Sequence, residues 1–125
     1  MVTLDAIRRL ARTLPGVEEG TSYGTAAFRA SKKFLARMYP DDLALVLKVG
    51  ETEQEFLIDA EPDIFYITDH YRGTSLVLVR LAEIDADAFE RLFVRSWRQV
   101  ASKKDIATFD AESQAKGAKG GSFAE

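Results

Sequence analysis

The sequence predicts an α+β fold, a single two-layer domain in which helices cover one antiparallel sheet. One observation is a strongly amphipathic helix at Asp85–Ala101, whose bulky apolar stripe needs another layer of structure to cover. A second is that the expected strands come as a run of three and a run of two, joined by an expected helix. Short connections in the first run favour antiparallel neighbours. The expected element order is therefore α-β-β-β-α-β-β-α.

The first element is expected to be a helix at Thr3–Leu14. Thr3 can cap it, because a short side-chain oxygen accepts a hydrogen bond from a free first-turn N–H. Pro15 and Gly16 end the helix, since proline cannot continue one and glycine readily takes the left-handed cap. The next segment, Val17–Thr25, holds two glycines at hinge or turn positions and is interpreted as a connector.

Three strands are expected next, at Ala26–Ala30, Phe34–Tyr39 and Leu43–Lys48. The turn residues that separate them are Ser31-Lys32-Lys33 and Pro40-Asp41-Asp42. Two short connections make this run an antiparallel meander, so the two turns project from opposite ends of the sheet. The first turn is basic and the second is acidic.

The middle of the chain is expected to hold a helix and two further strands. Glu51–Ala60 is predicted to be a short helix, with a strand at Glu55–Asp59 as the alternative. Strands are expected at Ile64–Thr68, which is rich in β-branched and aromatic residues, and at Ser75–Leu81, whose side chains alternate between two faces. Asp69–Thr74 is the loop between these strands.

The long helix and the segment after it differ in pattern. In Asp85–Ala101 the apolar residues recur at the helical period: Phe89, Leu92, Phe93, Trp97 and Val100. After Lys104 the pattern stops, and the chain is rich in alanine, glycine, serine and lysine. The expected organisation is one domain at residues 1–104 and a flexible tail, disordered or loosely attached, at residues 105–125. Ile106 and Phe109 are the tail residues able to dock its first turns.

Composition excludes several classes of protein. The 125 residues carry a net charge of −3 and no cysteine, which excludes disulfide frameworks, thiolate metal sites and cysteine nucleophiles. No run approaches the roughly 18 apolar residues of a membrane span, and the N-terminal segment has no apolar signal core. The expectation is a cytoplasmic, monomeric protein that does not contact a membrane.

Candidate catalytic groups are sparse. His70 is the only histidine, so no histidine pair can hold a metal. The chain has no nucleophile elbow, no zinc-protease motif and no phosphate-cradling glycine loop. The acidic residues between positions 51 and 63 fall at no calcium-loop spacing and suit a solvated face. The sequence therefore predicts a protein that is not an enzyme and that uses no cofactor or metal.

Charge is distributed unevenly along the chain. Residues 1–40 hold seven Lys/Arg and three Asp/Glu, whereas residues 41–70 hold one Lys and nine acids. Contact with a phosphate backbone needs cations, with flat rings beside them for sugar or base. The first hairpin and the Asp69–Thr74 loop carry such a set, here called the basic-loop residues: Arg29, Lys32, Lys33, Arg37, His70, Tyr71 and Arg72. The alternative to nucleic-acid contact is that these residues are ordinary polar residues of hairpin turns and loops, where lysines also block edge-to-edge aggregation of sheets.

Several short motifs follow one another in a characteristic order. They are Leu14–Glu19, Thr21–Thr25, Phe28-Arg29, Lys33–Arg37, Leu45–Lys48, Glu61-Pro62, Val77–Leu81 and Ser96–Ala101. In order and spacing they resemble the MmcQ/YjbR family over about residues 3–104. The resemblance implies a compact α+β domain with an antiparallel sheet. This sequence departs from the family pattern at Ala26, Ala30 and Lys32, where Lys32 replaces a glycine and adds charge to the turn.

The resemblance also implies a function. The family is commonly labelled DNA-binding, through its likeness to a double-wing DNA-binding fold in a phage transcription activator. In that case the cations of the basic-loop residues contact phosphates, and Tyr71 or His70 reaches a sugar or a groove edge. The alternative is a non-enzymatic module that binds a protein or a small ligand through the sheet face left uncovered by helices, or through a groove beside Tyr23 and Tyr39. The family label places DNA first among the expected partners.

Overall fold

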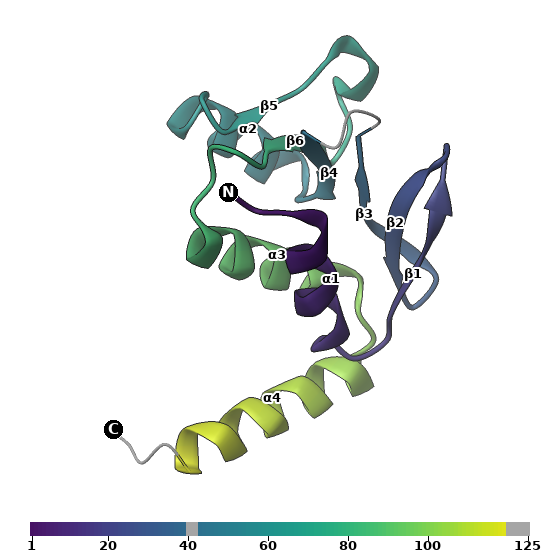
Figure 1. Cartoon of the computed structure of the whole chain (residues 1–125), viewed down its shortest axis with the longest axis vertical. Coiled ribbons are helices and arrows are strands. Elements are labelled where there is room, and N and C mark those ends of the chain that lie inside the picture. The colour runs from purple at the N-terminus through teal and green to yellow at the C-terminus, as the bar shows by residue number, and fades with distance from the viewer. Residues whose placement is uncertain (40–42, 120–125) are drawn as a thin grey trace.

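One antiparallel sheet organises the computed structural model, which describes residues 1–39 and 43–119 and the side chains of residues 1–39 and 43–114. The strands within those ranges are β1 (Val17–Ser22), β2 (Thr25–Ala30), β3 (Lys33–Met38), β4 (Ala44–Lys48), β5 (Phe65–Tyr66) and β6 (Leu76–Arg80). They pair in the order β1-β2-β3-β4-β6-β5, and each pairing is antiparallel (Figure 1). With the helices described below, the fold is α+β, as the sequence predicts.

Strand β1 corrects the prediction of a connector at Val17–Thr25. It pairs with β2 in continuous register, from Val17 opposite Ala30 to Ser22 opposite Thr25. Most β1 side chains are exposed, so the segment has no apolar alternation that would mark it as a strand. Its extended state comes from backbone pairing with β2, which satisfies the N–H and C=O groups that the two strands turn toward each other.

The ends of β2, β3, β4 and β6 differ by one residue from the sequence-based prediction. β5 has two residues in place of the five expected at Ile64–Thr68. The turn between β2 and β3 has positive φ at Ser31 (52°) and Lys32 (66°), which is typical of a two-residue type I′ turn. Lys32 therefore adopts the left-handed conformation without the help of glycine. The predicted turn at Pro40-Asp41-Asp42 lies outside the described residues.

The helices within the described ranges are α1 (Leu4–Arg12), α2 (Glu51–Ala60), α3 (Ala86–Val100) and α4 (Lys103–Lys119), with a short 3₁₀ helix η1 (Asp69–Tyr71). α2 confirms the helix prediction over the strand alternative. The predicted Thr3 cap is also confirmed, because Thr3 Oγ1 accepts from the Ala6 N–H at 3.2 Å. In the same way, Asp85 Oδ2 accepts from the N–H groups at positions 87 and 88.

The main core lies between one face of the sheet and helices α1 and α3 (Figure 1). The apolar stripe of α3 is buried there, so its prediction is confirmed. Phe28 on β2 meets Phe93 on α3 edge to face, with ring centroids 6.5 Å apart. Leu57 brings one turn of α2 into the same core.

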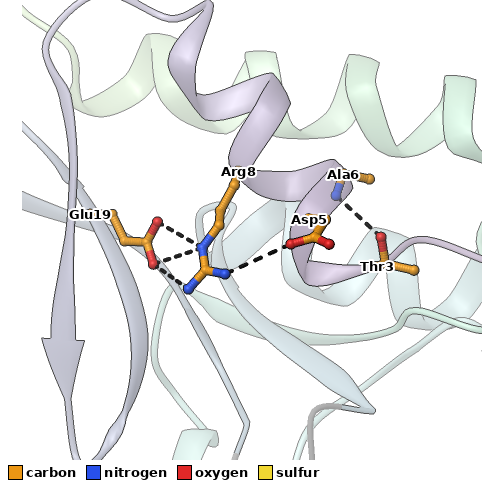
Figure 2. Close-up of polar contacts among 5 residues, drawn as sticks. All are labelled: Thr3, Asp5, Ala6, Arg8 and Glu19. Atoms are coloured by element: carbon orange, nitrogen blue, oxygen red, sulfur yellow. Dashed lines mark hydrogen bonds and ion pairs between the residues drawn. The ribbon is translucent and has the colours of Figure 1, made fainter.

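An ion pair ties α1 to the edge strand β1. Arg8 donates from Nε and Nη2 to the Glu19 carboxylate, with Nη2 and Oε2 2.8 Å apart (Figure 2). The hydrogen bond that Arg8 donates to Glu19 raises the pKa of Arg8. Arg8 Nη1 also lies 3.8 Å from Asp5, one turn earlier on α1. Glu19 therefore faces the helices, and the alternation of a strand places its neighbour Glu18 on the opposite side of the sheet.

Helix α4 differs from the flexible tail expected after Lys104. Residues 103–119 are helical, and Ile106 and Phe109 pack against the main core, which confirms their predicted docking. The Phe109 ring contacts the Trp97 ring at 5.1 Å, and Arg98 bonds Asp110 at 2.7 Å. Figure 1 shows the rest of α4 projecting away from the sheet. The domain boundary at residue 104 stays a prediction.

Candidate functional site

The sheet face opposite the helices, here called the outer face, has its own small apolar cluster. Ala44, Val46, Leu78 and Tyr71 are buried in it, and partly buried residues surround them: Phe34, Tyr39, Tyr66, Ile67 and Leu76. Strand alternation produces this face, since Leu45 and Leu47 of β4 turn toward the helices and their neighbours turn away. The loop after β5 covers part of the outer face through Tyr71.

Arg37 lies at the middle of the outer face. Strand register places it between Ala27 of β2 and Val46 of β4. Its Nη2 donates to Tyr71 Oη at 2.6 Å, and its Cζ lies 5.2 Å from the centroid of the Tyr23 ring. Tyr71 is only 5% exposed. Arg37 thus joins a buried tyrosine from one loop to an exposed tyrosine from another.

Tyr23 lies in the turn between β1 and β2, in a backbone conformation unusual for its residue type. Its φ is 53° and that of Gly24 is 78°, and Thr25 Oγ1 donates across the turn to the Ser22 carbonyl at 3.0 Å. A left-handed conformation costs a residue with a Cβ about 1–2 kcal/mol. The Tyr23 side chain is 87% exposed, so burial of its ring offsets little of this cost.

Gln54 of α2 holds the loop that carries Tyr71. Its Nε2 donates to three main-chain carbonyls, those of Leu76 at 2.6 Å, Thr74 at 3.0 Å and Tyr71 at 3.4 Å. The Gln54 side chain is buried, so its amide finds its hydrogen-bond partners in these carbonyls. Sequence reasoning missed this residue. A polar residue inside the apolar side of a short helix was the available signal.

The structure brings together only part of the basic-loop residues. Arg37 and Tyr71 bond one another, and the His70 ring contacts the Tyr71 ring at 4.9 Å. Arg72 is exposed and bonds Asp69 at 2.6 Å. The other members lie on β2, in the β2–β3 turn and at the start of β3, all of them exposed: Arg29, Lys32 and Lys33. Figure 1 shows the loop after β5 at the top of the view, well separated from the β2–β3 connection at the lower right.

Charge differs between the sheet and α2. The described strands carry five basic residues and two acidic ones. The basic residues are Arg29, Lys33, Arg37, Lys48 and Arg80, and the acidic ones are Glu18 and Glu19. Because Glu19 faces α1, Glu18 is the acidic strand residue left to the outer face. α2, by contrast, carries four acids and no basic residue. The outer face therefore carries cations from four strands and a single acidic strand residue, whereas the charged residues of α2 are all acidic.

Other sites are weaker candidates. A hollow of about 430 Å³ between α2 and the following loop is lined mainly by polar and acidic residues, with Arg72 at one side. Among the described residues, no group of three His, Cys, Asp or Glu side chains could hold a metal ion. Across residues 1–39 and 43–119, no helix combines the length and apolar content needed to cross a membrane.

Comparisons with known proteins agree with this architecture. The YjbR family model matches residues 12–99. Proteins of Mycobacterium tuberculosis strain H37Rv and of Mycobacterium bovis, both named as uncharacterized, are 30% identical over 131 aligned positions. Those alignments cover 90% of this chain and 99% of each relative. A crystal structure of a Deinococcus radiodurans protein with a DUF419 domain superposes with a TM-score of 0.72 at 24% identity, over 88% of this chain and 89% of that one.

Proposed function

The chain belongs to the MmcQ/YjbR family, and on this premise we propose that it is a DNA-binding domain. The proposed contact surface is the outer face of the sheet together with the β2–β3 turn. Lys32 and Lys33 contact phosphates from the turn, and Arg29 does so from the adjacent strand. The turn takes the place of one wing in a double-wing arrangement. The cytoplasmic location expected from the sequence is compatible with this role.

One observation carries the proposal, namely the segregation of charge. A chain of net charge −3 places four of its five strand-borne cations, Arg29, Arg37, Lys48 and Arg80, on the outer face, and α2 carries four acids and no basic residue. Such a distribution attracts a polyanion to one side of the protein and repels it from another. The Asp69–Thr74 loop contributes less than the sequence suggested, because Tyr71 is buried and Arg72 is paired with Asp69.

The direct test is a fluorescence-anisotropy titration with a short random duplex at low and at physiological salt. The double variant Lys32→Glu/Lys33→Glu should lose most of the affinity, and its log–log salt slope should fall by about two, as expected for two lost phosphate contacts. Lys103→Glu/Lys104→Glu at the start of α4 is the matched control, since it changes the charge equally at two exposed positions. Equal affinity of the two double variants would reject the assignment.

A second candidate function is a module that binds a protein or a small ligand. The partly exposed rings of Phe34, Tyr39 and Tyr66 on the outer face favour it. It predicts binding that is insensitive to salt. Amide shifts that map to these rings with a partner other than nucleic acid, together with no response to DNA at low salt, would select this function over the first.

A further inference from the structure

Tyr23 is an unusual residue for the turn position that it occupies. The first central position of a type I′ turn favours asparagine, aspartate or glycine, and tyrosine pays a conformational penalty there. Among the described residues it is the most exposed large hydrophobic side chain. A strained backbone conformation at a residue whose side chain is not buried points to a functional role.

The ring is nevertheless held in a defined place. One side of it lies over the Arg37 guanidinium, at 5.2 Å from centroid to Cζ. Arg37 is in turn fixed by the buried Tyr71 hydroxyl, 2.6 Å from Nη2. Because the ring is 87% exposed, the side away from Arg37 is open to solvent. A preorganised ring with one open side is a stacking platform for a flat molecule.

The same residues place a cation beside that platform. A guanidinium has five N–H donors, and Arg37 uses one on Tyr71 Oη and one on the Met38 carbonyl. Donors are left to bind a phosphate. Further cations lie along the outer face at Arg29, Lys48 and Arg80, on strands β2, β4 and β6. From β2 to β6 the row spans about 14 Å, at about 4.8 Å between neighbouring strands.

We infer that Tyr23 and Arg37 form a nucleotide subsite for single-stranded nucleic acid. The inference rests on the proposed function and specifies its ligand. An unpaired base stacks on the open side of the Tyr23 ring, and Arg37 bonds the adjacent phosphate. Bases inside a duplex are covered on both sides by their neighbours, so a stacking ring favours an unpaired strand. Stacking tolerates any base, so the subsite recognises a flexible strand and not a sequence.

Anisotropy titrations at low salt with a labelled 12-nucleotide DNA, its RNA equivalent and the matching DNA duplex test this inference. At least one single strand should bind more tightly than the duplex. Tyr23→Leu keeps the apolar bulk and the backbone penalty but removes the ring. It should weaken single-strand binding about ten-fold or more, the size expected for one lost stack, and leave duplex binding unchanged.

Two further variants make the result specific. Phe56→Leu is the matched control, because Phe56 is also an exposed aromatic residue (63%) but lies on the acidic helix α2. It should bind as wild type does. Tyr23→Trp should retain affinity for the single strand, and stacking of a base should quench the fluorescence of its exposed indole. The native Trp97 is buried, so its fluorescence should not change on binding.

The outcomes separate the two proposals. Duplex binding as tight as single-strand binding, or equal single-strand affinities of Tyr23→Leu and Phe56→Leu, would overturn the subsite and leave the DNA-binding proposal standing. Absence of binding to all three oligonucleotides at low salt would overturn both. Comparison of the DNA and RNA single strands shows which sugar the subsite accepts.

Discussion

The indole Nε1 of Trp97 donates to the Pro15 main-chain carbonyl across 3.1 Å, where the chain leaves α1 and enters β1. The two residues are 82 positions apart in the sequence. Trp97 is fully buried and also contacts Phe109 of α4. One side chain on α3 therefore holds together the first helix–strand connection and the C-terminal helix.

Replacing Trp97 separates its packing from its hydrogen bond. Trp97→Ala should lower the free energy of unfolding by about 3–5 kcal/mol, through the cavity and the lost apolar contact. Trp97→Phe keeps most of the ring and should cost about 1–3 kcal/mol, because the Pro15 carbonyl loses its donor. Urea unfolding followed by circular dichroism measures both. An unchanged free energy of unfolding in Trp97→Phe would show that the hydrogen bond contributes nothing.

Gln54→Leu should destabilise the loop that carries Tyr71. The change keeps the volume but removes the amide donor that links α2 to the Leu76, Thr74 and Tyr71 carbonyls, at a cost of about 1–3 kcal/mol. Hydrogen exchange should accelerate most at residues 71–76. Gln99→Leu is the control, since Gln99 is exposed and gives one bond to the Val49 carbonyl. Identical exchange in both variants would contradict the anchoring role of Gln54.

Tyr23→Asn should stabilise the fold. Asparagine followed by Gly24 is the preferred pair of a type I′ turn, and relief of the left-handed tyrosine is expected to add about 1 kcal/mol. The same variant should weaken binding of single-stranded nucleic acid. Gly24→Ala, at φ 78°, should instead destabilise the turn. Thermal unfolding should show a higher melting temperature for Tyr23→Asn and a lower one for Gly24→Ala. A lower melting temperature for Tyr23→Asn would show that Tyr23 is not strained in this turn.

Docking of α4 should weaken in acid. The hydrogen bond and the charge of Arg98 lower the pKa of Asp110 below its ordinary value. The stabilisation is complete above that ordinary value and is lost as the pH falls through the lowered value in the folded protein. Trp97 emission should shift to longer wavelength over this range as Phe109 leaves it.

Asp110→Asn tests the assignment of that transition. It removes the titrating carboxylate, so the acid shift of Trp97 emission should lose its Asp110 component. Glu112→Gln is the control, because Glu112 makes no ion pair with a described residue. An unchanged emission profile in Asp110→Asn would place the acid sensitivity elsewhere in the protein.

Local patterns were enough to predict most elements of the fold. The stripe of α3 and the alternation within β4 and β6 are short-range features that each element carries in its own sequence. β1 lacks such a pattern, because its exposed residues are held by pairing with β2 alone. α4 was missed because most of its residues are polar or alanine, and the contact of Phe109 with Trp97 that docks it joins two separate helices.

The arrangement of the candidate site likewise could not be predicted from local sequence patterns. Arg37 and Tyr71 were predicted as separate contacts for a ligand, but they lie 34 residues apart and bond one another. Gln54 of α2 bonds the loop that carries Tyr71, so the arrangement involves three elements and no local pattern encodes it. Tyr23 was noted beside a groove, and its strained turn became visible only with the backbone angles.

The two outermost strands also bear on how the protein behaves in crowded solution. A free sheet edge is a template onto which another copy can add a strand. Here β1 exposes Glu18, Glu19 and Gly20 along one edge, and β5 offers only two residues at the other. The charged side chains of β1 and the shortness of β5 therefore disfavour the addition of another strand at either edge of the sheet. We expect the chain to stay dispersed at high concentration, and Glu18→Thr/Glu19→Thr to start assembling, as light scattering would register.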